Sequence, residues 1–147
     1  MLRPLSVLVP LLLVAQFLVG MAVNLFVTIP KHHPGARPPE YFSGALQSVT
    51  WALLGSGLLW LVVHVVVGIL VFLFAIALLV TAIRAGRRGF AWAAGFGLVG
   101  VIAAGFNGAS FLNYNEDFSS MLMSGGFALA LTAYFIALLL PGSLDPR

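Results

Sequence analysis

Histidine is the residue with the widest chemistry in this chain, and the histidines fall in two different settings. His64 lies in a long apolar segment without charged residues, where an ionisable side chain is a functional hypothesis by default. A neutral imidazole in such a place can ligate haem iron, bind a metal or hydrogen-bond a quinone oxygen. His32 and His33 lie instead in a polar, proline-rich segment. His64 is therefore the first candidate for a binding group.

The sequence around His64 suggests one cofactor. His64 is followed one turn later by Gly68, and this pair resembles the haem-binding helices of four-helix membrane cytochromes, where a small residue lets the ring approach. The resemblance implies haem b, but those families usually supply a second histidine from another span, and this chain has none there. A single axial ligand, a ligand from another protomer or a methionine would be required. A hydrogen bond from His64 to Asn107 or Ser110 is the alternative, and it needs no cofactor.

Other combinations of reactive side chains are poor matches to known chemistry. The two loop histidines with Met121 and Met123 suggest copper, but positions two apart on a helix point about 200° away from each other. Glu116 and Asp117 are adjacent carboxylates in a tight turn beside asparagines, which does not favour acid–base catalysis. The absence of cysteine excludes thiolate sites. We therefore predict no catalytic residues and no metal site.

The elements that position these residues follow from the composition. The chain has 147 residues, of which 61% are hydrophobic and 7% charged. A soluble domain is roughly half apolar and about a quarter charged, and so short a chain cannot hide this excess from water. Lipid must be the solvent. Seven basic residues that are not clustered for groove binding are too few for a nucleic-acid surface, so the bilayer is the expected partner.

Charged and helix-breaking residues divide the chain into four apolar segments. The stretch from Tyr41 to Ile83 has no charge and is too long for one span, yet it barely fits two. We expect an all-α, four-transmembrane-helix bundle with a short extra helix before the second span. It forms one membrane domain over residues 1–147, with spans at about 5–29, 58–83, 90–112 and 119–140, an outer loop at 30–43 and a possible interfacial helix at 44–55.

Basic residues orient this bundle. With four spans, the cytoplasmic side holds Arg3, Arg84, Arg87, Arg88 and Arg147, whereas only Lys31 and Arg37 lie on the other side. The positive-inside rule then places both termini in the cytoplasm. The first span has no signal-peptide cleavage site, so it is expected to be retained. The high content of Ala, Gly and Val, with arginine in place of lysine, suggests a GC-rich bacterial genome, so we expect the location to be a bacterial inner membrane.

Small and polar residues recur at helical spacing in every span, which is typical of helices that pack together in lipid. The stripes are Gln16, Gly20, Asn24 and Thr28 in the first span; His64, Gly68, Val71 and Ala75 in the second; Gly100, Ala104 and Gly108 in the third; and Ser120, Ser124, Ala128 and Thr132 in the fourth. Each stripe is expected to face a neighbouring helix.

Several polar side chains lie at a similar depth in the outer half of the bundle. The candidates for a ligand pocket are His64, Asn107, Asn24, Ser110, Ser120 and Ser124. Amides and hydroxyls between membrane helices also serve as packing contacts, each worth about 0.6 kcal/mol. The cluster is therefore interpreted either as structural or as a modest pocket open to the outside.

The overall arrangement resembles small uncharacterised four-helix membrane proteins of bacteria, in the segments 24–30, 33–35 and 106–114. That resemblance implies no activity. The leading hypothesis is a non-enzymatic bundle subunit or small binding module, alone, as a homo-oligomer or in a larger membrane complex. The alternatives are a haem- or quinone-associated redox subunit that uses His64, and an oligomeric channel or transporter component.

Overall fold

The structure, a computed structural model, describes residues 2–140 and is all-α over that range. Its helices are α1 (Leu2–Phe26), α2 (Tyr41–Leu54), α3 (Leu59–Arg84), α4 (Arg88–Tyr114) and α5 (Asp117–Leu139). All but α2 are long and apolar enough to cross a membrane. The predicted all-α fold, with four long apolar helices and a short extra helix before the second of them, is thus confirmed. The first span starts earlier than predicted, because Pro4 falls in the first turn, where a missing N–H breaks no helical bond.

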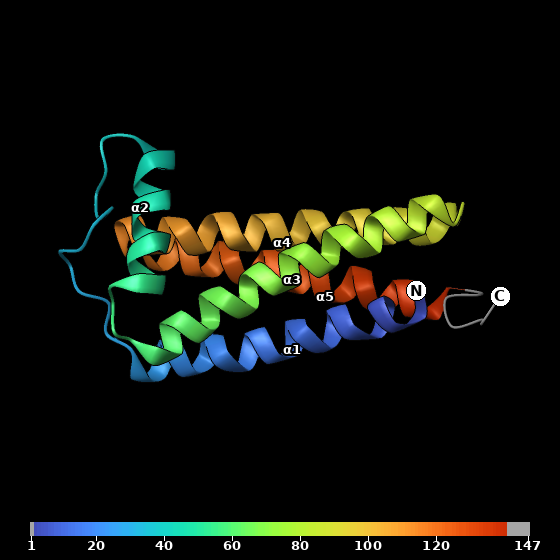
Figure 1. The fold of residues 1–147 in the computed structure, drawn as a ribbon, viewed down its shortest axis with the longest axis horizontal. Helices are drawn as coiled ribbons and strands as arrows, with labels where there is room; N and C mark the ends of the chain where they lie inside the picture. The colour runs from blue at the N-terminus through green and yellow to red at the C-terminus, as the bar shows by residue number, and fades with distance from the viewer. Residues whose placement is uncertain (1, 141–147) are drawn as a thin grey trace.

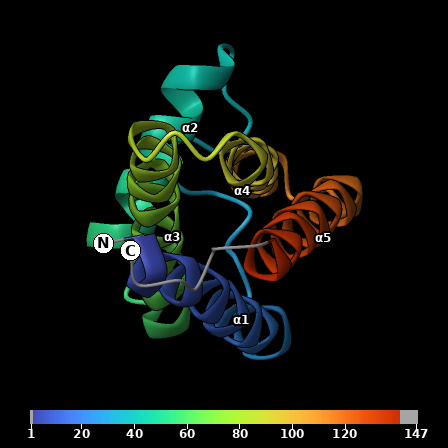
Figure 2. The same ribbon diagram turned by 90° about the vertical axis from the view of Figure 1, so that its right-hand side faces the viewer.

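The four long helices form a closed ring in which each one packs against two others (Figure 2). α1 contacts α3 and α5, and α4 contacts α3 and α5. Short α2 lies across one end of this ring, and α1 begins and α5 ends at the other (Figure 1). We call the end with α2 the capped end, and the end with the Arg84–Arg88 turn the basic end.

The closest helix crossing joins α4 to α5 through glycines. A methyl group built on Gly100 would lie 2.6 Å from the Gly126 oxygen, and one built on Gly126 would lie 2.6 Å from the Ala104 nitrogen. Because the two backbones are this close, only a glycine, whose side chain is a hydrogen atom, fits at these two positions. The predicted stripe of the third span is therefore a packing face. The predicted stripe of the fourth span is wrong, since its members Ser124, Ala128 and Thr132 are exposed.

The face that α5 does use is formed by Gly126, Ala130, Ala133, Tyr134 and Ala137, all of which are buried. α5 carries small residues on two faces. Only the buried face has a glycine, Gly126, where α5 crosses α4, and a large aromatic ring, Tyr134, further along the helix. The Tyr134 ring lies over Gly97 of α4, where any side chain would overlap it. The contact between the Tyr134 ring and Gly97 thus determines where along their lengths α4 and α5 pack against each other.

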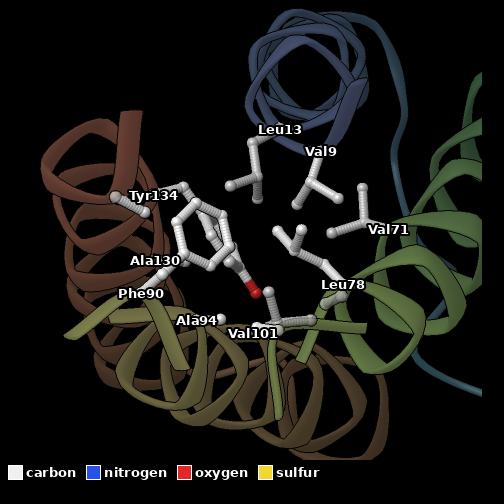
Figure 3. Packing of buried hydrophobic residues seen from close by; sticks show 12 residues of the cluster. Val9, Leu13, Val71, Leu78, Phe90, Ala94, Val101, Ala130 and Tyr134 are labelled. Carbon is white, nitrogen blue, oxygen red and sulfur yellow. The ribbon is translucent and has the colours of Figure 1, made fainter. Parts of the chain in front are cut away.

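Tyr134 carries a polar atom into the apolar core near the basic end. The side chain is 1% exposed, and its hydroxyl has no hydrogen-bond partner among the described residues. Figure 3 shows the oxygen amid the labelled core residues, which include Leu78, Ala94 and Val101. An unpaired buried hydroxyl opposes folding by about 1–3 kcal/mol.

We therefore expect Tyr134→Phe to stabilise the protein by about 1 kcal/mol, because the ring remains and only the unpaired hydroxyl is lost. Reversible unfolding in mixed micelles measures the change. Tyr114→Phe is the matched control, since Tyr114 is 38% exposed and should change stability little. A destabilised Tyr134→Phe protein would show that the hydroxyl has a partner.

Candidate functional site

The inward-facing residues are packed differently in the two halves of the bundle. Towards the basic end they are buried, as Val9, Leu13, Leu78 and Ala94 illustrate. Towards the capped end the corresponding positions are only half-buried; they are Gln16, Gly20, His64, Gly68, Ala104, Gly108 and Met123. The inward-facing side chains of the half nearer α2 are therefore less deeply buried, and they include the polar ones.

Gln16 of α1 and His64 of α3 form a hydrogen-bonded pair in this half. The Gln16 Nε2 and the His64 Nε2 lie 3.2 Å apart. Each side chain rests on a glycine of the facing helix: a methyl group on Gly20 would lie 3.0 Å from His64 Cε1, and one on Gly68 would lie 3.2 Å from Gln16 Nε2. The contact is thus reciprocal: the large side chain of each helix packs against the glycine that lies four residues from the large side chain of the other helix.

The pair leaves two polar atoms without partners. Gln16 Oε1 and His64 Nδ1 are both buried, and neither has a hydrogen-bond partner among the described residues. The amide nitrogen can only donate, so His64 Nε2 accepts and the neutral ring carries its proton on Nδ1. The unused groups are then one donor on His64 and one acceptor on Gln16. Rotating the amide by 180° exchanges the two roles but still leaves one of each.

The structure places the other predicted pocket residues elsewhere. Asn107 donates to the Ala103 oxygen of its own helix at 2.8 Å, and Ser124 donates to the Ser120 oxygen at 3.0 Å. Asn24 is exposed. The expectation that His64 bonds to Asn107 or Ser110 is wrong, because the tilt of α3 brings His64 against α1 (Figure 1).

Ser110 belongs to a separate network at the capped end. Its hydroxyl lies 3.0 Å from that of Tyr41, and the Tyr41 hydroxyl donates its proton to the Phe106 oxygen at 2.8 Å. The hydroxyl of buried Ser48 in α2 lies 2.8 Å from the Asn113 side-chain amide, with which it forms a hydrogen bond. These bonds fasten α2 to the last turns of α4, so the polar residues here hold the cap in place.

The loop between α1 and α2 completes this cap. The His33 ring stacks on Trp51 with 4.2 Å between centroids, and its Nε2 lies 3.1 Å from the Leu112 oxygen. The Arg37 N–H donates to the Asn113 oxygen at 2.7 Å. The last carbonyl groups of a helix have no hydrogen-bond partner within the helix. The loop supplies a partner for two of them in α4, those of Leu112 and Asn113. His33 has a structural place here, which sequence spacing alone did not indicate.

α2 begins with a carboxylate cap on its first turn. Both carboxyl oxygens of Glu40 accept backbone N–H groups, from Ser43 at 2.6 Å and from Phe42 at 2.8 Å. These two bonds, that of Ser43 being the larger cause, lower the pKa of Glu40 from its ordinary value of 4.5. The cap is therefore strongest when Glu40 is ionised.

We expect this cap to weaken in acid. Because the pKa of the folded state is lowered, the contribution of Glu40 is complete above pH 4.5 and is lost as the pH falls through the lower folded value. Carboxyl ¹³C shifts of Glu40 should titrate with a midpoint below 4.5, together with the amide ¹H shifts of Phe42 and Ser43. A midpoint at or above 4.5 would contradict the capping role.

Comparison with known proteins gives no relative. No protein-family model, curated protein or solved structure matches the chain. The function must therefore be inferred from the Gln16–His64 pair and its surroundings.

Proposed function

We propose that the chain is a non-enzymatic protein of the plasma membrane that acts as a small binding module, with the Gln16–His64 pair as its binding group. One observation carries this proposal: in two helices long and apolar enough to cross a membrane, a buried donor and a buried acceptor have no partner among the described residues. Lipid tails satisfy neither group, so a molecule that supplies both partners would be held there.

The chemistry of the pair defines the class of ligand. A group that both accepts and donates, such as a hydroxyl or an amide, matches the two free atoms. The remainder of the molecule must be apolar, since the side chains around the half-buried Gln16 and His64 are apolar. A lipophilic alcohol, amide or quinol is the ligand that this arrangement favours.

The alternative roles of His64 are less well supported. Iron ligation needs a ring nitrogen with a free lone pair, but Nε2 is bonded to Gln16, and Nδ1 carries the proton in the tautomer that this bond implies. A quinone fits better, because its carbonyl oxygen can accept from the Nδ1 donor. A channel through one copy is disfavoured by the buried apolar core near the basic end.

The distribution of basic residues supports an orientation. Arg3, Arg84, Arg87 and Arg88 belong to the basic end, whereas the capped end holds Lys31 and Arg37 together with the three described acidic residues. The positive-inside rule then favours a cytoplasmic basic end and an outward-facing cap. We propose a bacterial inner membrane as the location, with the ligand reached from the outer leaflet.

Extraction of the purified protein tests the proposal. Protein isolated in mild detergent should release a lipophilic compound, identified by mass spectrometry, that is absent from Gln16→Leu/His64→Leu protein. The matched control is His32→Leu/Gln47→Leu, which removes the same two residue types from exposed positions. Identical extracts from the wild type and the Gln16→Leu/His64→Leu protein would overturn the proposal.

A further inference from the structure

A groove of about 340 Å³ lies at the basic end, between the end of α3 and the start of α4. Its apolar wall is formed by Leu79 and Ile83 of α3 and by Ala91 and Trp92 of α4. Trp92 is 71% exposed and Ile83 61% exposed, so this wall opens towards lipid. Such a surface fits an acyl chain.

The turn that closes the groove is strongly basic. Arg87 and Arg88 line it, and Arg84 lies one turn earlier. Within residues 2–140 none of these arginines forms an ion pair, because the acidic residues of that range, Glu40, Glu116 and Asp117, belong to the capped end of the molecule. The groove therefore joins an apolar wall to guanidinium groups whose charge has no counterpart among the described residues around it.

We propose that this groove binds an anionic phospholipid. The phosphate lies at Arg87 and Arg88, and the part of an acyl chain nearest the headgroup lies along the apolar wall. A guanidinium group can donate two parallel hydrogen bonds to two oxygens of one phosphate, which gives the headgroup a defined position. Trp92 lies beside this charge, as aromatic side chains do at the level of lipid headgroups. This site is independent of the Gln16–His64 pair, which belongs to the other half of the bundle.

Native mass spectrometry with phosphatidylglycerol and phosphatidylcholine tests the site. The wild type should retain phosphatidylglycerol in preference, and Arg87→Gln/Arg88→Gln should bind it about 25-fold more weakly, since each basic residue contributes about fivefold. Phosphatidylcholine binding should change little. Equal retention of the two lipids by the wild type would overturn the proposal.

The control removes the same charge from the same end. Arg3→Gln/Arg84→Gln takes away two arginines that do not line the groove, and less than about a fivefold loss is expected. If both double variants lose equally, the attraction is diffuse and the groove is no site. Soluble glycerol phosphate should fail to displace the lipid. If it displaces phosphatidylglycerol at matched concentration, the apolar wall takes no part and the proposal fails.

Discussion

Leucine at Gly126 is expected to destabilise the protein by about 3 kcal/mol or more, because the α4–α5 crossing has no space for a side chain at this position. The first side-chain carbon would lie 2.6 Å from the Ala104 nitrogen and 2.8 Å from the Gly100 oxygen. Both are backbone atoms, which cannot rotate away as a side chain can. The hairpin of α4 and α5 must then separate, and separation opens the closed ring.

The neighbouring glycine supplies the control. Gly125 is exposed, and a side chain built there meets nothing within 4 Å. Gly125→Leu should therefore unfold at nearly the same denaturant concentration as the wild type, measured by circular dichroism in mixed micelles. If Gly125→Leu were as damaging as Gly126→Leu, the helix face that α5 presents to α4 would be wrongly assigned.

The Gln16–His64 pair is expected to behave non-additively. Gln16→Leu or His64→Leu alone should destabilise the protein by about 1–3 kcal/mol, because each leaves its partner's buried polar atoms without a bond. The double variant Gln16→Leu/His64→Leu should lie close to the wild type, since both polar groups are gone. The protein would then be folded and unable to hold a ligand.

A double-mutant cycle on the four proteins measures this coupling. Hydrogen bonds between membrane helices average about 0.6 kcal/mol and reach about 1.7 kcal/mol. Single effects of about 1–3 kcal/mol each, with a double variant near the wild type, correspond to a coupling energy of about 2 kcal/mol or more, above that range because each single variant also leaves a buried polar group unpaired. A coupling energy of that size supports direct bonding between the pair. Additive single effects would show that the two side chains do not interact and would remove the basis of the candidate site.

The sequence predicted the number and type of helices because the signals are local. Apolar length, prolines and charged turns each mark a span or its end without reference to a partner helix. The glycine stripe through Gly100 was also readable, since small residues at four-residue spacing admit a close helix. The Gln16–Gly20 and His64–Gly68 stripes were visible in the same way, and their identical spacing was a signal of the reciprocal contact.

The partners of these stripes could not be predicted, because they depend on helix tilt and order. His64 meets Gln16 rather than Asn107 because α3 crosses towards α1 at the capped end. The two small faces of α5 look alike in sequence, and only the position of Tyr134 relative to Gly97 selects one. The bond between His33 and the Leu112 oxygen joins residues far apart in the chain, so no local sequence pattern predicts it.

Native mass spectrometry of the protein released from membranes tests ligand binding by the Gln16–His64 pair most directly. The wild type and the His32→Leu/Gln47→Leu control should carry one lipophilic adduct per chain, and the folded Gln16→Leu/His64→Leu protein should carry none. Arg87→Gln/Arg88→Gln should keep this adduct, which separates it from phospholipid at the basic end. An adduct that persists in Gln16→Leu/His64→Leu, or a wild type without one, would contradict ligand binding at Gln16 and His64.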